Sequence, residues 1–149
     1  MKSIIVSACL MGENCKYNGG NNLKSELVAA LKDYNVILIC PEVDGGLSIP
    51  RVPAEIIGEQ VINQVGIDVT SNYLLGANLA LKKALENDVK IAILKAKSPS
   101  CGSNQIYDGT FSHTLTTGDG VTSKLFKANG IKVYTENNYQ EIFQQNRLF

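Results

Sequence analysis

Four cysteines stand out in this chain, because thiolates bind soft metal ions and act as nucleophiles. They are dispersed over the sequence, at Cys9, Cys15, Cys40 and Cys101. The sequence contains no CxxC pair, which argues against a zinc ribbon and against a thioredoxin-type redox pair. Three of the four have polar or turn-forming neighbours, as expected for loops. An iron–sulfur cluster suits such a set, because its thiolate ligands need no tight sequence spacing.

Three of the cysteines follow apolar segments that are typical of buried parallel strands. The segments are residues 3–9, 35–40 and 90–96. Cys9 and Cys40 end the first two, and Cys101 lies a few residues beyond the third. The carboxyl ends of parallel strands meet at one edge of a sheet, where ligands bind. We therefore predict that these three converge there, and that Cys15, in the loop after the first strand, can reach the same place.

The number of ligating thiolates decides what a cluster does. Four would saturate a [4Fe–4S] cluster and leave a structural or electron-transfer centre, whereas three would leave one iron open as a Lewis acid. The alternative is that each cysteine is a small buried hydrophobic residue, which is the commonest fate of cytosolic cysteine. We find no secretory signal at the apolar start of the chain, so we expect a cytoplasmic protein with reduced thiols.

The loops beside the cysteines contain groups that could act as acid, base or binding residues. Glu42 comes two residues after a cysteine, where a carboxylate would lie beside a bound metal, although an exposed loop acid is the alternative. Arg51 and Glu55 lie in a proline-bracketed loop and could bind a polar substrate or pair with each other. Ser98 and Ser100 precede the last cysteine, where they could position a substrate or simply form a turn.

The elements that must position these residues form an α/β pattern. Residues 131–136 predict a fourth strand. Helices are predicted over 23–34 and 71–87, from near Val121, and from about Tyr139 to the C-terminus. On the second helix, one face carries a stripe that we expect to be buried: Leu74, Leu75, Asn78, Leu81 and Leu85. Strands alternating with helices indicate βαβ crossovers and a parallel sheet.

Size and charge restrict the class of partner. The 149 residues, 44% of them hydrophobic, predict a single domain over 1–149. The 14 Lys and Arg balance the 14 Asp and Glu, which argues against a nucleic-acid partner and favours a small substrate. No apolar run approaches the length of a membrane span, so we expect no membrane partner. The oligomeric state cannot be read from the sequence.

Five blocks of sequence together resemble the family known as domain of unknown function 523, in order and over nearly the whole chain. The blocks are VSACLMGENCKYNGG (6–20), CPEVDGGLSIPRVPAEI (40–56), DVTSNYLLGA (68–77), ILKAKSPSCG (93–102) and IYDGTFSHTLTTGDGVTSKLF (106–126). Members of that family include 2-thiouracil desulfurases. The resemblance implies a Rossmann-like three-layer fold with a mainly parallel sheet of about four to five strands. It also implies a [4Fe–4S] cluster held by three cysteines.

Matched motif by motif, the resemblance implies that Cys9, Cys40 and Cys101 are the ligands and that Cys15 is a spare. It gives acid–base and substrate-positioning roles to Glu42 and to one serine, Ser98 or Ser100. The expected reaction is non-redox desulfuration of a small thiolated pyrimidine such as 2-thiouracil, giving uracil and sulfide. One alternative is a non-catalytic zinc, iron–sulfur or thiol-sensing protein that uses all four cysteines. A third possibility is an interaction domain with buried thiols.

Overall fold

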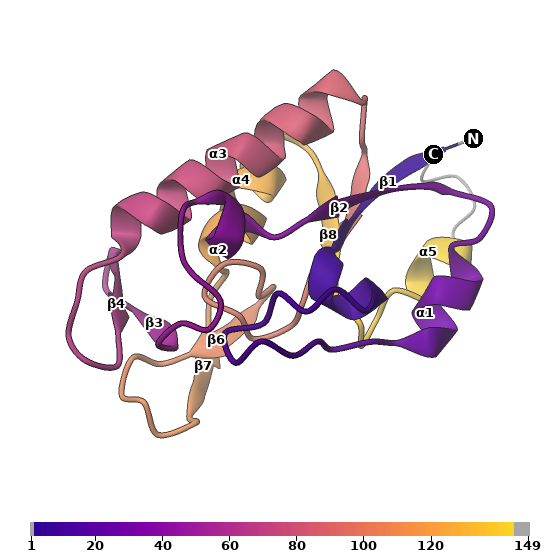
Figure 1. Cartoon of the computed structure of the whole chain (residues 1–149). Coiled ribbons are helices and arrows are strands. Elements are labelled where there is room, and N and C mark those ends of the chain that lie inside the picture. The colour runs from indigo at the N-terminus through magenta and orange to yellow at the C-terminus, as the bar shows by residue number, and fades with distance from the viewer. Residues whose placement is uncertain (1, 145–149) are drawn as a thin grey trace.

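A parallel four-stranded sheet forms the middle of the molecule, as the sequence predicts (Figure 1). The structure is a computed structural model that describes residues 2–144. The sheet has the order β2-β1-β5-β8. Its strands are β1 (Ser3–Ser7), β2 (Asn35–Ile39), β5 (Ile91–Ile93) and β8 (Lys132–Tyr134). Each is shorter than the apolar segment that predicted it, because the last residues of those segments already turn away into the loops.

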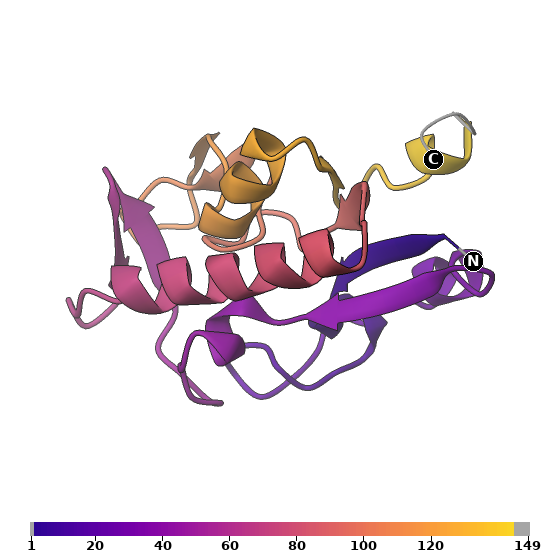
Figure 2. The same ribbon diagram turned by 90° about the horizontal axis from the view of Figure 1, so that it is seen from above.

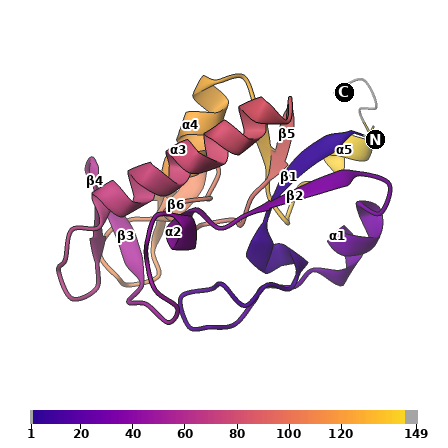
Figure 3. The same cartoon turned by 45° about the horizontal axis from the view of Figure 1, so that its top comes forward.

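Helices cover both faces of the sheet, which gives the three layers expected of a Rossmann-like fold. Successive residues of β1 point to opposite faces, so Ile5 packs on one side and Ile4 and Val6 on the other. The Ile5 face carries α3 (Thr70–Glu86) and α4 (Val121–Ala128), which lie side by side in Figures 2 and 3. The opposite face is covered by α1 (Ser25–Ala30) and α5 (Glu141–Gln144). Residues 145–149, which were predicted to continue the last helix, lie outside the described residues.

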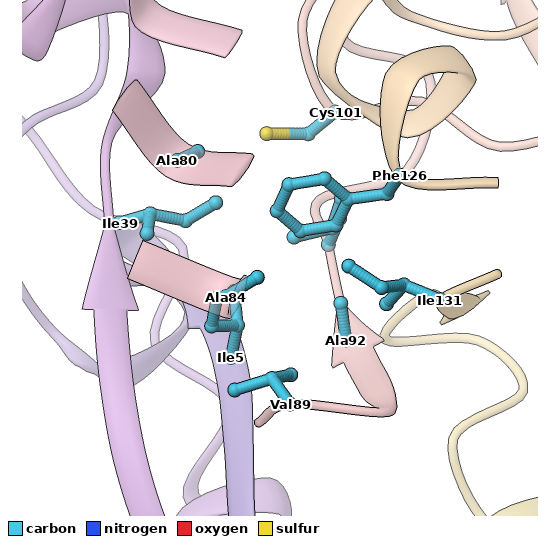
Figure 4. Packing of buried hydrophobic residues seen from close by; sticks show 10 residues of the cluster. Ile5, Ile39, Ala80, Ala84, Val89, Ala92, Cys101, Phe126 and Ile131 are labelled. Carbon is cyan, nitrogen blue, oxygen red and sulfur yellow. The ribbon is translucent and has the colours of Figure 1, made fainter. Parts of the chain in front are cut away.

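The core on the Ile5 face is made by aliphatic residues of the sheet and small residues of α3 (Figure 4). Ala80 and Ala84 contact the sheet directly, and Phe126 of α4 fills the space beside them. The side chain of Cys101 points into this cluster from the loop after β5. One predicted ligand therefore lies at the boundary between the core and the end of the sheet.

The predicted buried face of the second helix is wrong. The predicted helix itself is confirmed as α3, but Leu74, Leu75 and Leu85 are 49%, 51% and 61% exposed. The buried face consists mostly of small residues: Tyr73, Gly76, Ala77, Ala80 and Ala84. Small residues let the helix axis approach its neighbours closely, and this close packing decides which face is buried.

Two long segments without a strand or helix pattern, residues 41–66 and 97–120, contain antiparallel hairpins, which the sequence did not predict. The first holds a short helix, α2 (Pro41–Asp44), followed by β3 (Ala54–Ile57) and β4 (Gln60–Asn63). The second holds β6 (Gln105–Tyr107) and β7 (Leu115–Thr117). Both hairpins lie beyond the carboxyl end of the sheet (Figure 1). In the described part of the chain, no helix is long and apolar enough to cross a membrane.

Candidate active site

A cavity of about 690 Å³ lies at the carboxyl end of the sheet, and all four cysteines line it. The position follows from the topology. The chain leaves β1 through α1 on one face of the sheet, and it leaves the neighbouring strand β5 through α4 on the other face. Parallel sheets form a crevice at the point where adjacent connections diverge in this way.

The structure brings together the three cysteines that the sequence placed at strand ends. Cys9 lies in a single 3-10 turn (Ala8–Met11) directly after β1. Cys40 is the residue between β2 and α2, and Cys101 lies in the loop between β5 and β6. Cys15, from the loop after that 3-10 turn, lines the same cavity. All four are free thiols.

The four thiols differ in how readily they lose a proton. Burial raises the pKa of Cys9 and raises that of Cys101 to about 12. Cys15 and Cys40 are adjacent, and the hydrogen bond between their side chains raises the pKa of Cys15 and lowers that of Cys40 to about 7. The side-chain amide of Asn22 donates to the sulfur of Cys9 at 3.3 Å, as N–H groups do to cluster thiolates.

Glu42 lies on the cavity wall and is held by two donors. Arg51 Nη2 lies 2.6 Å from Glu42 Oε2, and the Tyr73 hydroxyl donates to Glu42 Oε1 at 2.5 Å. The same Arg51 nitrogen also donates to the backbone carbonyl of Cys15 at 2.9 Å. The Arg51 side chain is 7% exposed. The arginine that the sequence suggested for substrate binding is thus already engaged with the candidate acid or base.

The two serines before Cys101 have different surroundings. The Ser98 oxygen accepts hydrogen bonds from the backbone N–H groups of Ser100 and Cys101, both at 3.0 Å. Both bonds use the Ser98 oxygen as acceptor, so its hydroxyl hydrogen can still be donated to a ligand in the cavity that Ser98 lines. Ser100 is 1% exposed, and its hydroxyl lies 2.9 Å from that of Thr122 at the start of α4. The geometry favours Ser98 for contact with a ligand.

Glu55 shapes the cavity wall through the backbone of the β6–β7 hairpin. Its carboxylate oxygen Oε1 accepts from the N–H groups of Gly109 and Phe111, at 2.9 and 3.1 Å. Three aromatic side chains line the cavity: Tyr107, Phe111 and His113. The rings of Tyr107 and His113 meet edge to face, with their centroids 6.0 Å apart. Arg51 and Glu55 do not pair with each other, because each has other partners in the protein.

The loop that carries Ser98 and Cys101 is fixed against the start of α4. The backbone N–H of Val121 donates to the Pro99 carbonyl, and that of Thr122 donates to the Ser100 carbonyl, each at 2.8 Å. A Cβ at Gly120 would lie 2.5 Å from the Ser100 carbonyl oxygen, so only glycine permits this contact. The start of α4, at Gly120, therefore packs directly against the loop that carries Cys101.

Comparison with known proteins identifies the family of this chain. A sequence profile of the 2-thiouracil desulfurase family matches residues 4–138. The chain belongs to this family. The resemblance inferred from the five sequence blocks is therefore confirmed.

Two relatives illustrate how closely the 2-thiouracil desulfurase family shares this chain's sequence and fold. An uncharacterized protein of Bacillus subtilis (strain 168), YbbK, is 43% identical over 149 residues, covering 93% of this chain and 99% of the relative. The solved structure of the [4Fe-4S]-dependent thiouracil desulfidase TudS is 40% identical, with a TM-score of 0.93 and full coverage of both chains. The α/β fold predicted from the sequence is confirmed by that match.

Sequence reasoning missed several residues that line this cavity. Tyr73, which contacts Glu42, and Lys95, which lines the cavity and pairs with Glu136 at 2.9 Å, were not proposed. Asn22 beside Cys9 was also missed. The one available signal was that Tyr73 and Lys95 fall within two of the five resembling blocks, 68–77 and 93–102.

Proposed function

We propose that this chain is a [4Fe–4S]-dependent desulfidase that converts a thiolated pyrimidine such as 2-thiouracil, with water, into uracil and sulfide. The main support is the cavity, in which three thiols at strand ends lie together with the Glu42 carboxylate, which accepts hydrogen bonds from Arg51 and Tyr73. The chain also belongs to the 2-thiouracil desulfurase family. The thiocarbonyl sulfur is exchanged for a water oxygen, so atoms balance without an external oxidant or reductant. The free thiols suit the cytoplasm, where cysteines stay reduced.

The donor set around the cavity fits a cluster. In the described residues, 2–144, no three His, Cys, Asp or Glu side chains are close enough to share a single metal ion. A cluster makes a different demand, since each thiolate binds its own iron atom. Cys9, Cys40 and Cys101 would be the ligands, because each follows a different strand of the sheet at its carboxyl end. Lys95 of the cavity wall would offset the negative charge of the thiolates.

The chemistry divides between the cluster and the side chains. The bound cluster supplies an open metal position that binds soft sulfur and polarises the thiocarbonyl group. Glu42 holds the attacking water through a carboxylate oxygen and takes its proton. Ser98 donates its hydroxyl hydrogen to the pyrimidine ring. Arg51 acts on Glu42 rather than on the substrate, because its guanidinium already bonds that carboxylate.

The aromatic side chains of the cavity support a planar heterocycle as the substrate. Tyr107 and Phe111 line the same cavity as the four thiols, which would let a pyrimidine stack on an aromatic ring while its sulfur reaches the cysteines. Glu55 contributes indirectly, by holding the backbone of Phe111.

The non-catalytic alternative has one observation in its favour, which is that Cys15 lies beside Cys40 on the cavity wall. If Cys15 were a fourth ligand, the cluster would be saturated and the protein would store or sense metal. The two functions differ in whether the cluster-loaded protein turns over substrate.

The test is anaerobic purification with iron and acid-labile sulfide analysis, followed by addition of 2-thiouracil. We expect about four irons per chain and the release of uracil and sulfide in equal amounts. A loaded protein that releases neither product from 2-thiouracil or 4-thiouracil would contradict the desulfidase and favour the saturated site. Absence of iron after anaerobic reconstitution would contradict an iron–sulfur site of either kind and leave zinc binding or buried thiols.

Substitution of the two serines should separate their roles. Ser98→Ala is expected to lower kcat about tenfold, because it removes a donor to the substrate. Ser98→Thr, which keeps the hydroxyl, should restore most of the rate. Ser100→Ala is expected to lower the unfolding midpoint with little change in kcat, since its hydroxyl bonds Thr122. The opposite pattern in steady-state kinetics would make Ser100 the acting serine.

A further inference from the structure

The first half of α3 lies against α2, the short helix that carries Glu42. A Cβ at Gly76 would lie 1.8 Å from the backbone oxygen of Pro41, and one at Gly45 would lie 2.0 Å from that of Asn72. The two helices therefore touch backbone to backbone, and Figure 1 shows α2 lying beside α3. The Asn72 side chain also donates to the Gly45 carbonyl at 2.8 Å. The block DVTSNYLLGA thus holds α2 in place.

The Tyr73 side chain reaches from α3 to Glu42 on α2. Its ring is 2% exposed and packs in a cluster with Val61 and Val69, which fixes the position of the hydroxyl. The hydroxyl donates to Glu42 Oε1 at 2.5 Å. Burial, followed by the neighbouring Glu42 charge, raises the pKa of Tyr73 well above its usual value. The hydroxyl consequently stays protonated and remains a donor.

The two donors together define the plane of the Glu42 carboxylate. Arg51 contacts only Oε2, so alone it would leave the carboxylate free to rotate about its last side-chain bond. Tyr73 contacts the other oxygen and removes that freedom. A base must point at the proton it takes, and small misplacements of a catalytic group are costly in rate.

We propose that Tyr73 is a positioning residue for desulfuration, which fixes the plane of the Glu42 carboxylate through the hydrogen bond from its hydroxyl. This inference rests on the proposed function for its effect on rate. The contact itself belongs to the protein alone, so it can also be tested without substrate.

The kinetic test compares Tyr73→Phe with the wild type in the full, iron-loaded chain. The substitution removes one oxygen atom and keeps the packed ring. We expect kcat to fall about tenfold, the usual loss for one hydrogen bond to a charged group, with KM within about twofold. Iron content and the visible absorption of the cluster should be unchanged. Tyr139→Phe is the matched control, because Tyr139 is equally buried in the cluster on the other face of the sheet.

A double variant decides whether Tyr73 acts through Glu42. In a Glu42→Gln background, Tyr73→Phe should produce no further fall in the residual kcat, because the base it positions is gone. A tenfold fall in both backgrounds would overturn the proposal, as would an unchanged kcat or a loss of iron in the single variant.

Thermal unfolding of the loaded protein provides the readout that needs no substrate. The unfolding midpoint of a Tyr73→Phe, Glu42→Ala double variant should shift by less than the sum of the two single shifts, because both changes remove the same bond. Strictly additive shifts would overturn the contact even if the chain has another substrate. Coupled shifts in a protein without desulfidase activity would instead place the failure in the proposed function.

Discussion

Serine variants of Cys9, Cys40 and Cys101 are each expected to lose the cluster and, with it, all measurable desulfuration. Each thiol follows a different strand. Cys15 lies beside Cys40 and is the one thiol placed to replace a lost ligand, so partial iron retention in the Cys40 variant would point to that replacement. A serine hydroxyl is a harder and far less acidic ligand than a thiol, and it binds iron poorly. Iron should fall from about four atoms per chain to less than one after anaerobic reconstitution. Iron analysis and the uracil assay measure the two losses separately.

Cys15→Ser is the control for this series. Cys15 lies in the same cavity and has the same chemistry, but the proposal makes it a spare thiol. The variant should keep about four irons and turn over substrate at close to the wild-type rate. If it loses iron as the others do, the site uses four thiolates and the non-catalytic alternative gains. If none of the four variants loses iron or stability, the thiols are only buried residues of the core.

The parallel sheet and its helices could be predicted because the signals are local. β-branched runs such as residues 35–40 indicate strands without knowledge of their neighbours, and strand–helix alternation then determines the parallel topology. The convergence of Cys9 and Cys101 follows from that topology alone, since both residues come after adjacent parallel strands.

The buried face of α3 could not be predicted, because hydrophobicity was the wrong criterion there. Leucines such as Leu75 form the more apolar stripe, yet the helix buries Gly76 and Ala80. That face is selected by the close approach of α2 at Gly76. The contact joins Gly76 to Pro41, which lies 35 residues earlier in the sequence. No periodicity within the helix contains that information.

The same limit applies to the candidate site. The sequence identified Glu42 and Arg51 as residues able to do chemistry. It did not indicate that the two side chains bond each other. Tyr73 was missed because a tyrosine in an apolar helix looks like a core residue, which it also is. The Tyr73 hydroxyl reaches Glu42 only because α2 packs against α3 in the fold.

Glu42→Gln is expected to retain the cluster and lose about a thousandfold in kcat. Glutamine has nearly the same shape as glutamate, so the packing of α2 on α3 should survive. Its amide oxygen can still accept a hydrogen bond from Tyr73 or Arg51, but it cannot take a proton from water. The loss should therefore appear in kcat, with iron content at the wild-type level and KM changed only slightly.

Asp44→Asn is the matched control, because Asp44 lies on the same four-residue helix but is exposed. It removes an equal negative charge from α2 without touching the cavity wall, and kcat should stay within about twofold of the wild type. Equal rates for Glu42→Gln and the wild type would remove Glu42 from the mechanism, and some other group would then have to activate the water. A Glu42→Gln protein without iron would instead make this carboxylate part of the cluster site, because the three thiolates alone would not hold the metal.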